Sequence, residues 1–361
     1  LKSILSSEKR QEDLIKEELK EVREKFADAR RTDIVAKKEE IEVEDLIIEE
    51  DMVVSVTGTG YIKRMPLTTY RQQKRGGRGV AAMGTSEADF VEHLFVASSK
   101  DTLLFFTSQG KIYPLKTYEV PTGSRISKGR AIVNLLSLSG EEKVTAILSI
   151  EEFDSEKFIF MATQKGMVKR TSLGLFSNIR KSGIFAITLN KGDSLIGAGI
   201  CAEEESVILA TQNGLSIRFK SGSIRTTGRQ SQGVRGVKLS KKDSVLGMVL
   251  IKGSLKEDGF YLLTATTKGF AKRTPIQEYR LQFRGGKGVI NIKLAPKIGE
   301  VGALVLVRSD DEVMCITQKG ILIRTKVQDI RVSGRSTQGV KIINLEKTDK
   351  LATIARIVPE D

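Results

Sequence analysis

One short pattern, Thr-x-x-Gly followed by apolar and basic residues, occurs six times in this 361-residue chain. The six glycines lie 48 to 56 residues apart and are Gly60, Gly110, Gly166, Gly214, Gly269 and Gly320. That interval is the length of one small antiparallel sheet, and such units in series form a propeller-like array. Because glycine adopts the positive φ of a tight hairpin, we expect each copy to be a turn between two strands.

Each copy also carries positive charge soon after its turn. The residues are Lys63 and Arg64, Lys111, Lys169 and Arg170, Arg218, Lys272 and Arg273, and Arg324. Because these cations recur at a similar place in every repeat, we expect them to form a ring on the surface. Such a surface suits a long polyanion.

The net charge is unevenly distributed along the chain. The whole chain has 59 Lys and Arg against 45 Asp and Glu, a formal charge of +14. Residues 1–50 carry −5, so residues 51–361 carry +19. A repeat region this basic favours nucleic acid as the partner, and the alternative is a soluble surface that is simply rich in lysine.

Cysteine and histidine are scarce. Cys201 and Cys315 lie in apolar segments, and we expect both to be small buried strand residues. His93 is the one histidine, and we expect it to be partly buried in a strand. These residues are too few for a disulfide framework or a zinc site, so we predict no metal site.

The chain shows no apolar run of transmembrane length and no signal-peptide pattern, so we expect no membrane contact and a cytoplasmic location. Because the chain begins with Leu1, we expect it to be a piece of a longer polypeptide. The pattern of apolar residues predicts a helix from residue 8 to about 31, with Ser6 or Ser7 as its N-cap and a narrow stripe suited to docking on another helix. Residues 32–45 are predicted to be an acidic linker. The expected domains are therefore a helix and linker at 1–45 and a β domain at 46–361.

A second glycine recurs, usually 19 residues after the first, and a short apolar strand follows it. These glycines are Gly79, Gly129, Gly183, Gly233, Gly288 and Gly339. We expect Val144–Ile150 to open the third repeat. Residues 351–358 resemble such an opening strand, and we expect them to pair with the first repeat and close a ring, the alternative being an open spiral.

The loop before the second glycine is where function is expected, because a rigid scaffold positions it. In the first repeat this loop is Gln73, Lys74, Arg75, Gly76, Gly77, Arg78 and Gly79. Glycine lets the backbone approach a phosphate closely, and arginine offers a bidentate fork to phosphate oxygens. No residue here has the character of a base reader, so we expect sequence-independent contacts with the DNA backbone.

The other repeats keep positive charge at the same place. The fifth loop, 282–288, is a near copy with Phe283 in place of a basic residue. Across the other repeats the predicted DNA-binding residues are Lys128, Arg130, Arg180, Lys181, Arg229, Arg235, Arg284, Lys287 and Arg335. Arg125, Arg225, Arg331 and Lys341 add charge nearby. For a ring of repeats, this pattern predicts a basic belt around the edge.

The segment Gln73–Gly79 resembles the seven-residue box of bacterial DNA gyrase A subunits, and the six repeats resemble the C-terminal domain of those subunits. The resemblance covers essentially the whole chain, including the end of a coiled-coil region at 15–34. It implies an all-β fold, a six-bladed β-pinwheel whose blades exchange strands, preceded by one helix. It also implies that DNA wraps around the basic rim, so that the ATP-driven enzyme introduces negative supercoils.

The resemblance implies that this fragment is not an enzyme by itself, and the sequence shows no ATP-binding loop, no acidic metal cluster and no tyrosine in a catalytic context. We therefore expect no cofactor in the fragment, because ATP and Mg²⁺ belong to other parts of the enzyme. The implied partners are double-stranded DNA, the gyrase B subunit, plus the rest of the gyrase A subunit. The alternatives are the related topoisomerase IV subunit, which usually has a degraded box, and a propeller scaffold for protein partners. The scarcity of aromatic residues and the absence of Trp argue against the scaffold.

Overall fold

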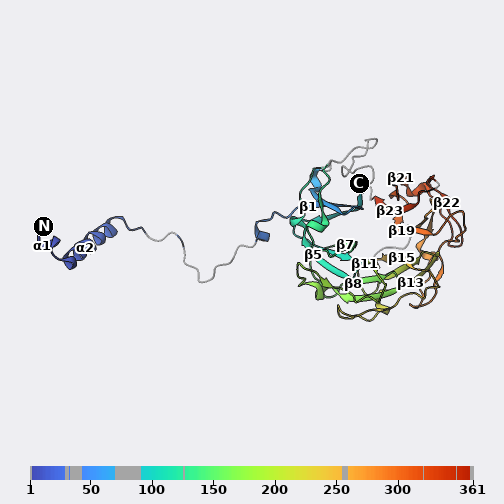
Figure 1. Cartoon of the computed structure of the whole chain (residues 1–361), viewed down its shortest axis with the longest axis horizontal. Coiled ribbons are helices and arrows are strands. Elements are labelled where there is room, and N and C mark those ends of the chain that lie inside the picture. The colour runs from blue at the N-terminus through green and yellow to red at the C-terminus, as the bar shows by residue number, and fades with distance from the viewer. Residues whose placement is uncertain are drawn as a thin grey trace. The chain divides into compact units, whose positions relative to one another are not determined.

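The computed structural model of the chain describes residues 2–28, 32, 43–69, 91–124, 127–253, 259–319, 321–346 and 348–357. The chain divides into two compact units, Leu1–Leu46 and Ile47–Asp361. Figure 1 shows helices in the first unit and a circle of small sheets in the second. The two units are described separately below.

The first unit contains two α-helices, α1 (Lys2–Leu5) and α2 (Glu8–Phe26), and a short 3-10 helix, η1 (Val43–Leu46). The predicted helix at 8–31 is too long, because Ala27 leaves the helical conformation with a ψ of 115°. Ser7 occupies the N-cap position, without a side-chain hydrogen bond to the helix. The apolar stripe of α2 is exposed, with Leu19 at 63% and Phe26 at 76%, so docking on another helix stays a prediction.

The second unit is built from six antiparallel sheets. Sheet one has the order β3 (Val91–Ser98), β1 (Asp51–Thr57), β2 (Tyr61–Pro66), β6 (Arg130–Ala131). Sheet two has the order β10 (Ile184–Phe185), β5 (Lys111–Lys116), β4 (Thr102–Thr107), β7 (Val144–Ile150). Sheet three has the order β11 (Leu195–Cys201), β8 (Phe158–Thr163), β9 (Met167–Ser172), β14 (Val234–Arg235).

The remaining sheets follow the same plan. Sheet four has the order β15 (Val245–Ile251), β12 (Ser206–Thr211), β13 (Leu215–Lys220), β18 (Val289–Ile290). Sheet five has the order β19 (Val301–Arg308), β16 (Phe260–Thr266), β17 (Phe270–Pro275), β22 (Val340–Lys341). Among the described residues, sheet six has β21 (Leu322–Lys326), β20 (Glu312–Thr317) and β23 (Leu351–Ile357). The predicted all-β, six-bladed fold class is confirmed.

Short 3-10 helices connect these strands. They are η2 (Leu67–Thr69), η3 (Thr117–Glu119), η4 (Ile132–Asn134), η5 (Leu173–Phe176), η6 (Ser221–Ser223), η7 (Ile276–Glu278) and η8 (Val327–Asp329). Except for η4, each follows the second strand of its sheet, so the chain turns at the same point in every repeat.

The threonine of each repeat has a defined role in its hairpin turn. In the third repeat, the Thr163 hydroxyl accepts a hydrogen bond from the backbone N–H of Met167 at 3.1 Å, and the Gly166 N–H donates to the Thr163 carbonyl at 3.0 Å. The same hydroxyl contact recurs in the first, fourth, fifth and sixth repeats. Gly166 has a φ of +79°, which glycine adopts without strain. The predicted hairpin turns are therefore confirmed where they are described.

The short fourth strand of each complete sheet comes from the next repeat. In sheet two, Ile184 and Phe185 pair with Ile112 and Lys111 of β5, although they follow sheet three's hairpin in sequence. The carbonyl of the turn glycine then accepts the next backbone N–H, as Gly110 does from Ala186 at 2.8 Å. Neighbouring sheets therefore share one hydrogen-bonded backbone, and the edge of each sheet that receives such a strand is covered.

The predicted repeat boundary was wrong. β7 (Val144–Ile150) does not open sheet three; it pairs with β4 and completes sheet two, with Thr102 opposite Ile150. By the same rule β23 pairs with β20 inside sheet six and not with the first repeat. Because β23 is the third strand of sheet six, it does not begin a seventh unit. No pairing joins sheet six to sheet one among the described strands, so closure of the ring stays a prediction.

Apolar side chains fill the space between neighbouring sheets. Leu104 and Phe106 of sheet two pack with Ile159 and Met161 of sheet three, and all four are fully buried. In each sheet, the strand that comes third along the chain is called the third strand here. Third strands of neighbouring sheets contact one another, as β11 does with β7 and β15. In Figure 1 these third strands lie toward the centre of the circle, so the second and fourth strands form its outer rim.

The two cysteines and the histidine follow the predictions made for them. Cys201 and Cys315 are free, buried strand residues, and burial raises the pKa of each thiol to about 11. His93 lies half-buried in β3.

The second recurring glycine allows the exchanged strand to approach its neighbour. Gly288 has a φ of +79°, and a Cβ there would lie 2.2 Å from the Ser216 carbonyl oxygen. Gly129, Gly233 and Gly339 stand in the same relation to the preceding sheet. This close approach is the structural reason for the glycine.

We therefore predict that Gly288→Ala lowers the free energy of unfolding by about 2 kcal/mol or more, since it adds both positive-φ strain and a backbone clash. Denaturant titration would measure the change. Gly228→Ala is the matched control, because Gly228 lies in the loop before β14 with open space around it. Equal stability of the two variants would contradict the close-approach argument.

Candidate nucleic-acid interface

The cations that follow each hairpin turn are not a surface ring, and this expectation is corrected. Lys63, Lys169 and Lys272 are fully buried in the second strands of sheets one, three and five. Arg170, Arg218 and Arg273 are between 5% and 9% exposed. These cations do recur at regular positions, but most of the buried ones bind backbone carbonyls of a neighbouring repeat and do not face solvent.

Each of the three buried lysines binds the loop that arrives from the next repeat, and Lys169 also binds a carbonyl of its own repeat. The Lys169 ammonium donates to the carbonyls of Ala186, at 2.7 Å, and Arg229. The Lys272 ammonium donates to those of Gly334 and Arg335, both at 2.7 Å. Lys63 donates in the same way to the carbonyls of Ser124 and Ser127, in the loop before β6. Two of these acceptors belong to predicted DNA-binding arginines, so the buried cations position part of the rim.

Arg64 and Arg273, next to two of these lysines, and Arg218 of sheet four act similarly. Arg64 donates from Nε to the Val120 carbonyl at 2.6 Å, and Arg273 donates from Nε to the Ile330 carbonyl at 2.6 Å. Arg218 donates from Nη1 to the Tyr279 carbonyl at 3.3 Å. Each acceptor lies in the next repeat, so the guanidinium groups tie successive repeats together.

Burial lowers the pKa of all three buried lysines, Lys63 included. Desolvation lowers the pKa of Lys169 and of Lys272 to about 8. For Lys272, the nearby Glu278 carboxylate opposes this shift and Arg335 adds to it. A neutral amine still has two N–H donors for its two carbonyl acceptors, so the contact survives loss of the proton.

The predicted DNA-binding residues of the first repeat, Gln73, Lys74, Arg75, Gly76, Gly77, Arg78 and Gly79, lie outside the described residues. All the other predicted residues lie in or beside the loops that precede the fourth strands, which we call the rim loops. Those with exposed side chains are Lys128, Arg130, Arg180, Lys181, Arg235, Arg284 and Lys287. Arg229 and Arg335 are half-buried.

Several rim cations are held in place. The Lys128 ammonium lies 4.2 Å from the centre of the Tyr61 ring, and Lys181 pairs with Glu119 at 3.1 Å. Arg284 donates from Nη1 to the Arg235 carbonyl at 3.2 Å, and Arg335 donates to the Ile290 carbonyl at 3.3 Å. The last two contacts occupy the same place in successive repeats, so the structure brings these predicted residues together in a repeating order.

Backbone hydrogen bonds join neighbouring rim loops. The N–H groups of Thr188, Lys238 and Lys293 donate to the carbonyls of Ser231, Gly286 and Thr337, at 2.9 to 3.1 Å. Each donor lies five residues after the second glycine of its repeat, and each acceptor lies two residues before the next one. The loops of repeats three to six therefore form one continuous belt.

Sequence reasoning missed two cations of this belt. Lys238 and Lys293 are exposed and follow the second glycine of successive repeats at the same offset. Their spacing from Gly233 and Gly288 was the available signal. They extend the positive charge beyond the loops themselves.

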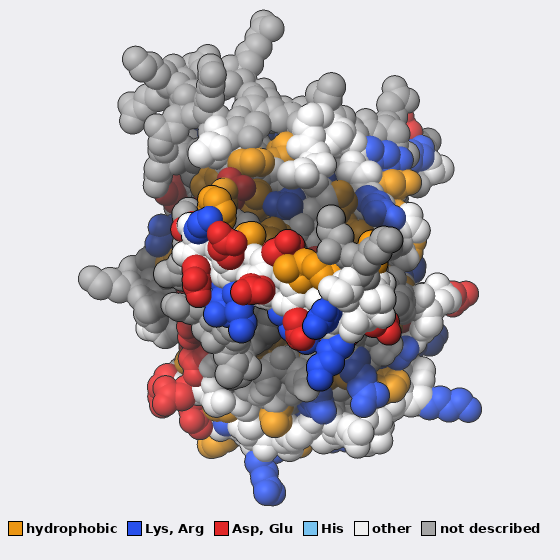
Figure 2. All heavy atoms as spheres, turned by 90° about the vertical axis from the view of Figure 1, so that its left-hand side faces the viewer, with side chains coloured by type: hydrophobic (Ala, Val, Ile, Leu, Met, Phe, Trp, Pro, Cys, Tyr) orange, Lys and Arg blue, Asp and Glu red, His pale blue; other side chains and the backbone are white. Residues whose placement is uncertain are grey.

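The two edges of the sheets differ in charge. The hairpin edge holds the Thr-x-x-Gly turns and the turns before each third strand. Its exposed lysines, which outnumber its exposed carboxylates Glu141, Glu300 and Glu346, are Lys143, Lys165, Lys191, Lys241, Lys242, Lys268, Lys297, Lys319 and Lys350. The connection edge, where each third strand leads to the next sheet, is mixed in charge, with exposed Glu151, Glu152, Glu203, Glu204 and Asp310 beside Lys157, Lys220, Lys252 and Arg308. In the lower part of the face in Figure 2, acidic groups lie toward the left and basic groups toward the right, whereas both signs are mixed across its middle.

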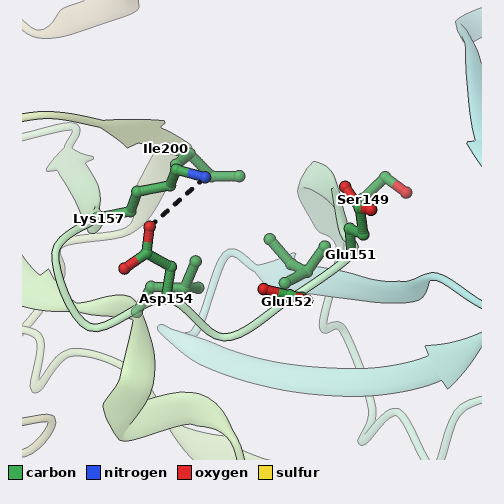
Figure 3. A pocket seen from close by; sticks show the side chains of 8 residues that line it. Ser149, Glu151, Glu152, Asp154, Lys157 and Ile200 are labelled. Carbon is green, nitrogen blue, oxygen red and sulfur yellow. Dashed lines mark ion pairs between the residues drawn. The ribbon is translucent and has the colours of Figure 1, made fainter.

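A hollow of about 340 Å³ lies on the connection edge. Glu151, Glu152 and Asp154 line it, with an ion pair of 3.6 Å between Asp154 and Lys157, as Figure 3 shows. The acidic lining opposes phosphate binding at this point. Within the described part of the chain, no group of three or more His, Cys, Asp or Glu residues could hold a metal ion. No described helix is both long and apolar enough to cross a membrane.

Comparisons with known proteins agree with this architecture. The family model described as "DNA gyrase C-terminal domain, beta-propeller" matches six segments, 51–98, 101–151, 157–202, 205–252, 261–307 and 311–357. Each segment runs from the first to the third strand of one sheet, counted along the chain. The chain is 41% identical over its whole length to the DNA gyrase A subunit of Mycolicibacterium smegmatis and 42% identical over 96% of its length to that of Salmonella typhimurium. It spans 42% and 39% of those two relatives.

Two solved structures have the same fold. A DNA gyrase A C-terminal domain is 26% identical, with a TM-score of 0.68 over 86% of this chain and all of that one. The C-terminal domain of a DNA topoisomerase IV has a TM-score of 0.74 over 86% of this chain and 94% of that one, at 24% identity. The second likeness concerns the fold alone.

The buried lysines lead to a prediction about stability. Lys169→Met leaves two carbonyls without their donor, so we expect the free energy of unfolding to fall by about 2 kcal/mol. The loss should grow as the pH rises from 8 to 10.5, because the unfolded wild-type chain binds one more proton than the folded chain in this range, so raising the pH favours the folded state of the wild type and not that of the variant. Urea titrations below pH 8 and near pH 10 would measure this.

Lys165→Met is the control, because Lys165 is an exposed lysine of the same hairpin. Its effect on stability should be small and the same at both pH values. A difference between Lys169→Met and wild type that does not widen with pH would contradict the lowered pKa.

Proposed function

This chain belongs to the DNA gyrase C-terminal domain family, and on that premise we propose that it binds, bends and wraps duplex DNA along its outer rim. The observation that carries the proposal is the belt of hydrogen-bonded loops with exposed Lys and Arg at equivalent places. A duplex presents phosphates at regular intervals, so a series of cations spaced along a curved surface can follow it.

The proposed contacts are with the DNA backbone. Arg235, Arg284 and Lys287 are exposed at the rim, where guanidinium and ammonium groups can meet phosphate oxygens. Phosphate oxygens are the same in every DNA sequence, so contacts with them carry no sequence information. Binding without sequence preference follows from this chemistry.

Bending the duplex has a cost that the contacts must exceed. Bending about 20–30 bp through a right angle costs several kcal/mol. Loops held by buried Lys169 and Lys272 are already ordered before DNA arrives. Less conformational entropy is then lost on binding, and more of the electrostatic attraction remains available to bend the DNA.

Charge also restricts the path of the DNA. The fourth strands pair with the beginning of each second strand, as Phe185 does with Lys111, so they lie nearer the hairpin edge. The lysines of that edge attract phosphates, and the carboxylates of the connection edge repel them. We propose that the duplex follows the rim on the side of the hairpin edge.

We further propose that the chain acts as a non-catalytic, DNA-wrapping part of a gyrase. Its partners would be the B subunit, together with the rest of the A subunit, which supply the ATP-dependent, Mg²⁺-dependent chemistry and strand passage. The glycine-rich segment Gln73–Gly79 supports gyrase over topoisomerase IV. The predicted boundary between helix with linker (1–45) and DNA-binding domain (46–361) belongs to this proposal.

The first test is the dependence of binding on salt. If six or more phosphates are neutralised, a plot of log affinity against log salt concentration should have a slope of about −5 or steeper. Changing Arg284 and Lys287 together to Ala should weaken binding to all sequences alike and make the slope shallower by about 2. Fluorescence anisotropy with unrelated duplexes would measure both effects.

Lys157→Ala is the matched control, because Lys157 is an exposed lysine on the connection edge. It should leave both the affinity and the slope unchanged. A wild-type slope of only about −1 or −2, as for one or two phosphate contacts, would reject the wrapped path.

The second test concerns the first-repeat loop. Changing Lys74, Arg75 and Arg78 to Ala should reduce DNA bending more than affinity, because the loops of the other repeats remain to bind. Circularisation of a short duplex would report bending, and ligation of a nicked circle with the protein bound would report the wrap and its sign. Unchanged circularisation would remove this loop from the proposed site.

A further inference from the structure

The fifth rim loop presents an aromatic side chain where the first-repeat loop has a basic one. Phe283 is 96% exposed, although its neighbours Arg284 and Lys287 keep the charged pattern of the first loop. Leu281 in the same segment is 50% exposed, and Ile290 in the following strand β18 is 45% exposed. Single exposed apolar residues are ordinary on a protein surface, but Phe283 is almost fully exposed in a loop whose charged side chains are cations.

The loop that carries Phe283 is anchored on both sides. The Gln282 N–H donates to the Arg218 carbonyl at 2.8 Å, and the Gly285 N–H donates to the Gly236 carbonyl at 2.6 Å. The Gly286 carbonyl accepts from the Lys238 N–H at 2.9 Å. The phenyl ring is therefore presented from a backbone that is held in place, and little ordering is needed when a partner meets it.

Cations accompany Phe283 in this part of the rim. Arg284 is braced by the Arg235 carbonyl, and Arg335 from the next repeat donates to the carbonyl of Ile290. Lys287 lies on the far side of the glycine pair, Gly285 and Gly286, with its side chain exposed. An apolar group between phosphate-binding groups is the arrangement with which proteins wedge a side chain between base pairs while holding the flanking phosphates.

We propose that Phe283 is a wedge that enters between two base pairs of the bound duplex and kinks it at the fifth repeat. This inference rests on the proposed DNA-binding function and adds a contact with base faces to it. Unstacking one step costs free energy, and the ring recovers part of it by stacking on the bases. Flexible pyrimidine–purine steps should be preferred at this point, because they unstack most readily.

Duplex DNA suits Phe283 better than a protein partner does. Phe283 presents a single ring, and its loop is part of the hydrogen-bonded basic belt of the rim. A protein partner would need a larger apolar area, and its surface would have to match the cations Arg235, Arg284, Lys287 and Arg335.

The absence of Trp from the chain allows a direct test in the whole protein. In Phe283→Trp the new indole is the only one in the chain, and stacking on bases should quench its emission about twofold and protect it from acrylamide. Leu175→Trp is the matched control, because Leu175 is an exposed apolar residue of η5 on the connection edge. Its emission should not respond to DNA.

A second measurement separates the effect of the Phe283 ring on bending from the effect of charge on affinity. Circularisation of a duplex of about 150 bp should fall about fivefold in Phe283→Ala, with affinity nearly unchanged. Phe283→Lys restores the charge pattern of the first loop, so it should bind at least as tightly as wild type and still bend DNA poorly.

The outcomes are distinguishable. Normal DNA binding by Phe283→Trp with an unquenched, acrylamide-accessible indole, or full bending by Phe283→Lys, would overturn the wedge and leave the DNA-binding proposal intact. Indole emission that responds only to the other gyrase parts would overturn it in favour of a protein contact. No binding of DNA by the wild-type chain at low salt would overturn the proposed function itself.

Discussion

The exchange of one short strand between neighbouring sheets is the interaction on which the rest of this structure depends. Two residues of each repeat from the second to the sixth add to the sheet before them, and the turn glycine of that sheet accepts the next N–H. A Cβ at Gly288 would collide with the neighbouring backbone, so glycine is required where the strands meet. Because each of these repeats completes its neighbour, the sheets are joined and the outer edges of sheets one to five are covered.

This exchange also explains why positive charge has two roles in the chain. Lys169 and Lys272 are buried between repeats and bind backbone carbonyls, whereas Arg235 and Arg284 are exposed on the rim. The first group orders the loops that carry part of the second. Since a buried ammonium needs acceptors and a loop needs an anchor, one set of hydrogen bonds satisfies both requirements.

The differences between repeats matter as much as their similarity. Lysine occupies the third position after the turn in sheets one, three and five, whereas Tyr113 and Ile217 occupy it in sheets two and four. The glycine-pair loop 282–288 packs against sheet four, where Ile217 stands in place of the lysine, and it is anchored by backbone hydrogen bonds and by the Arg284 side chain. It is in this loop that the aromatic Phe283 replaces a cation. The rim is therefore a series of related but distinct contacts with DNA.

The sequence by itself determined the number of repeats, the hairpin turns and the loops that bear the exposed cations, because these depend on local spacing and on the backbone freedom of glycine. Only the tertiary structure decided which repeat each strand completes. Val144–Ile150 has the same alternation whether it opens one sheet or closes another, and its partner β4 is distant in sequence. The structure also decided that Lys63, Lys169 and Lys272 are buried, because a lysine that binds a carbonyl of another repeat has no local sequence signal that separates it from an exposed one.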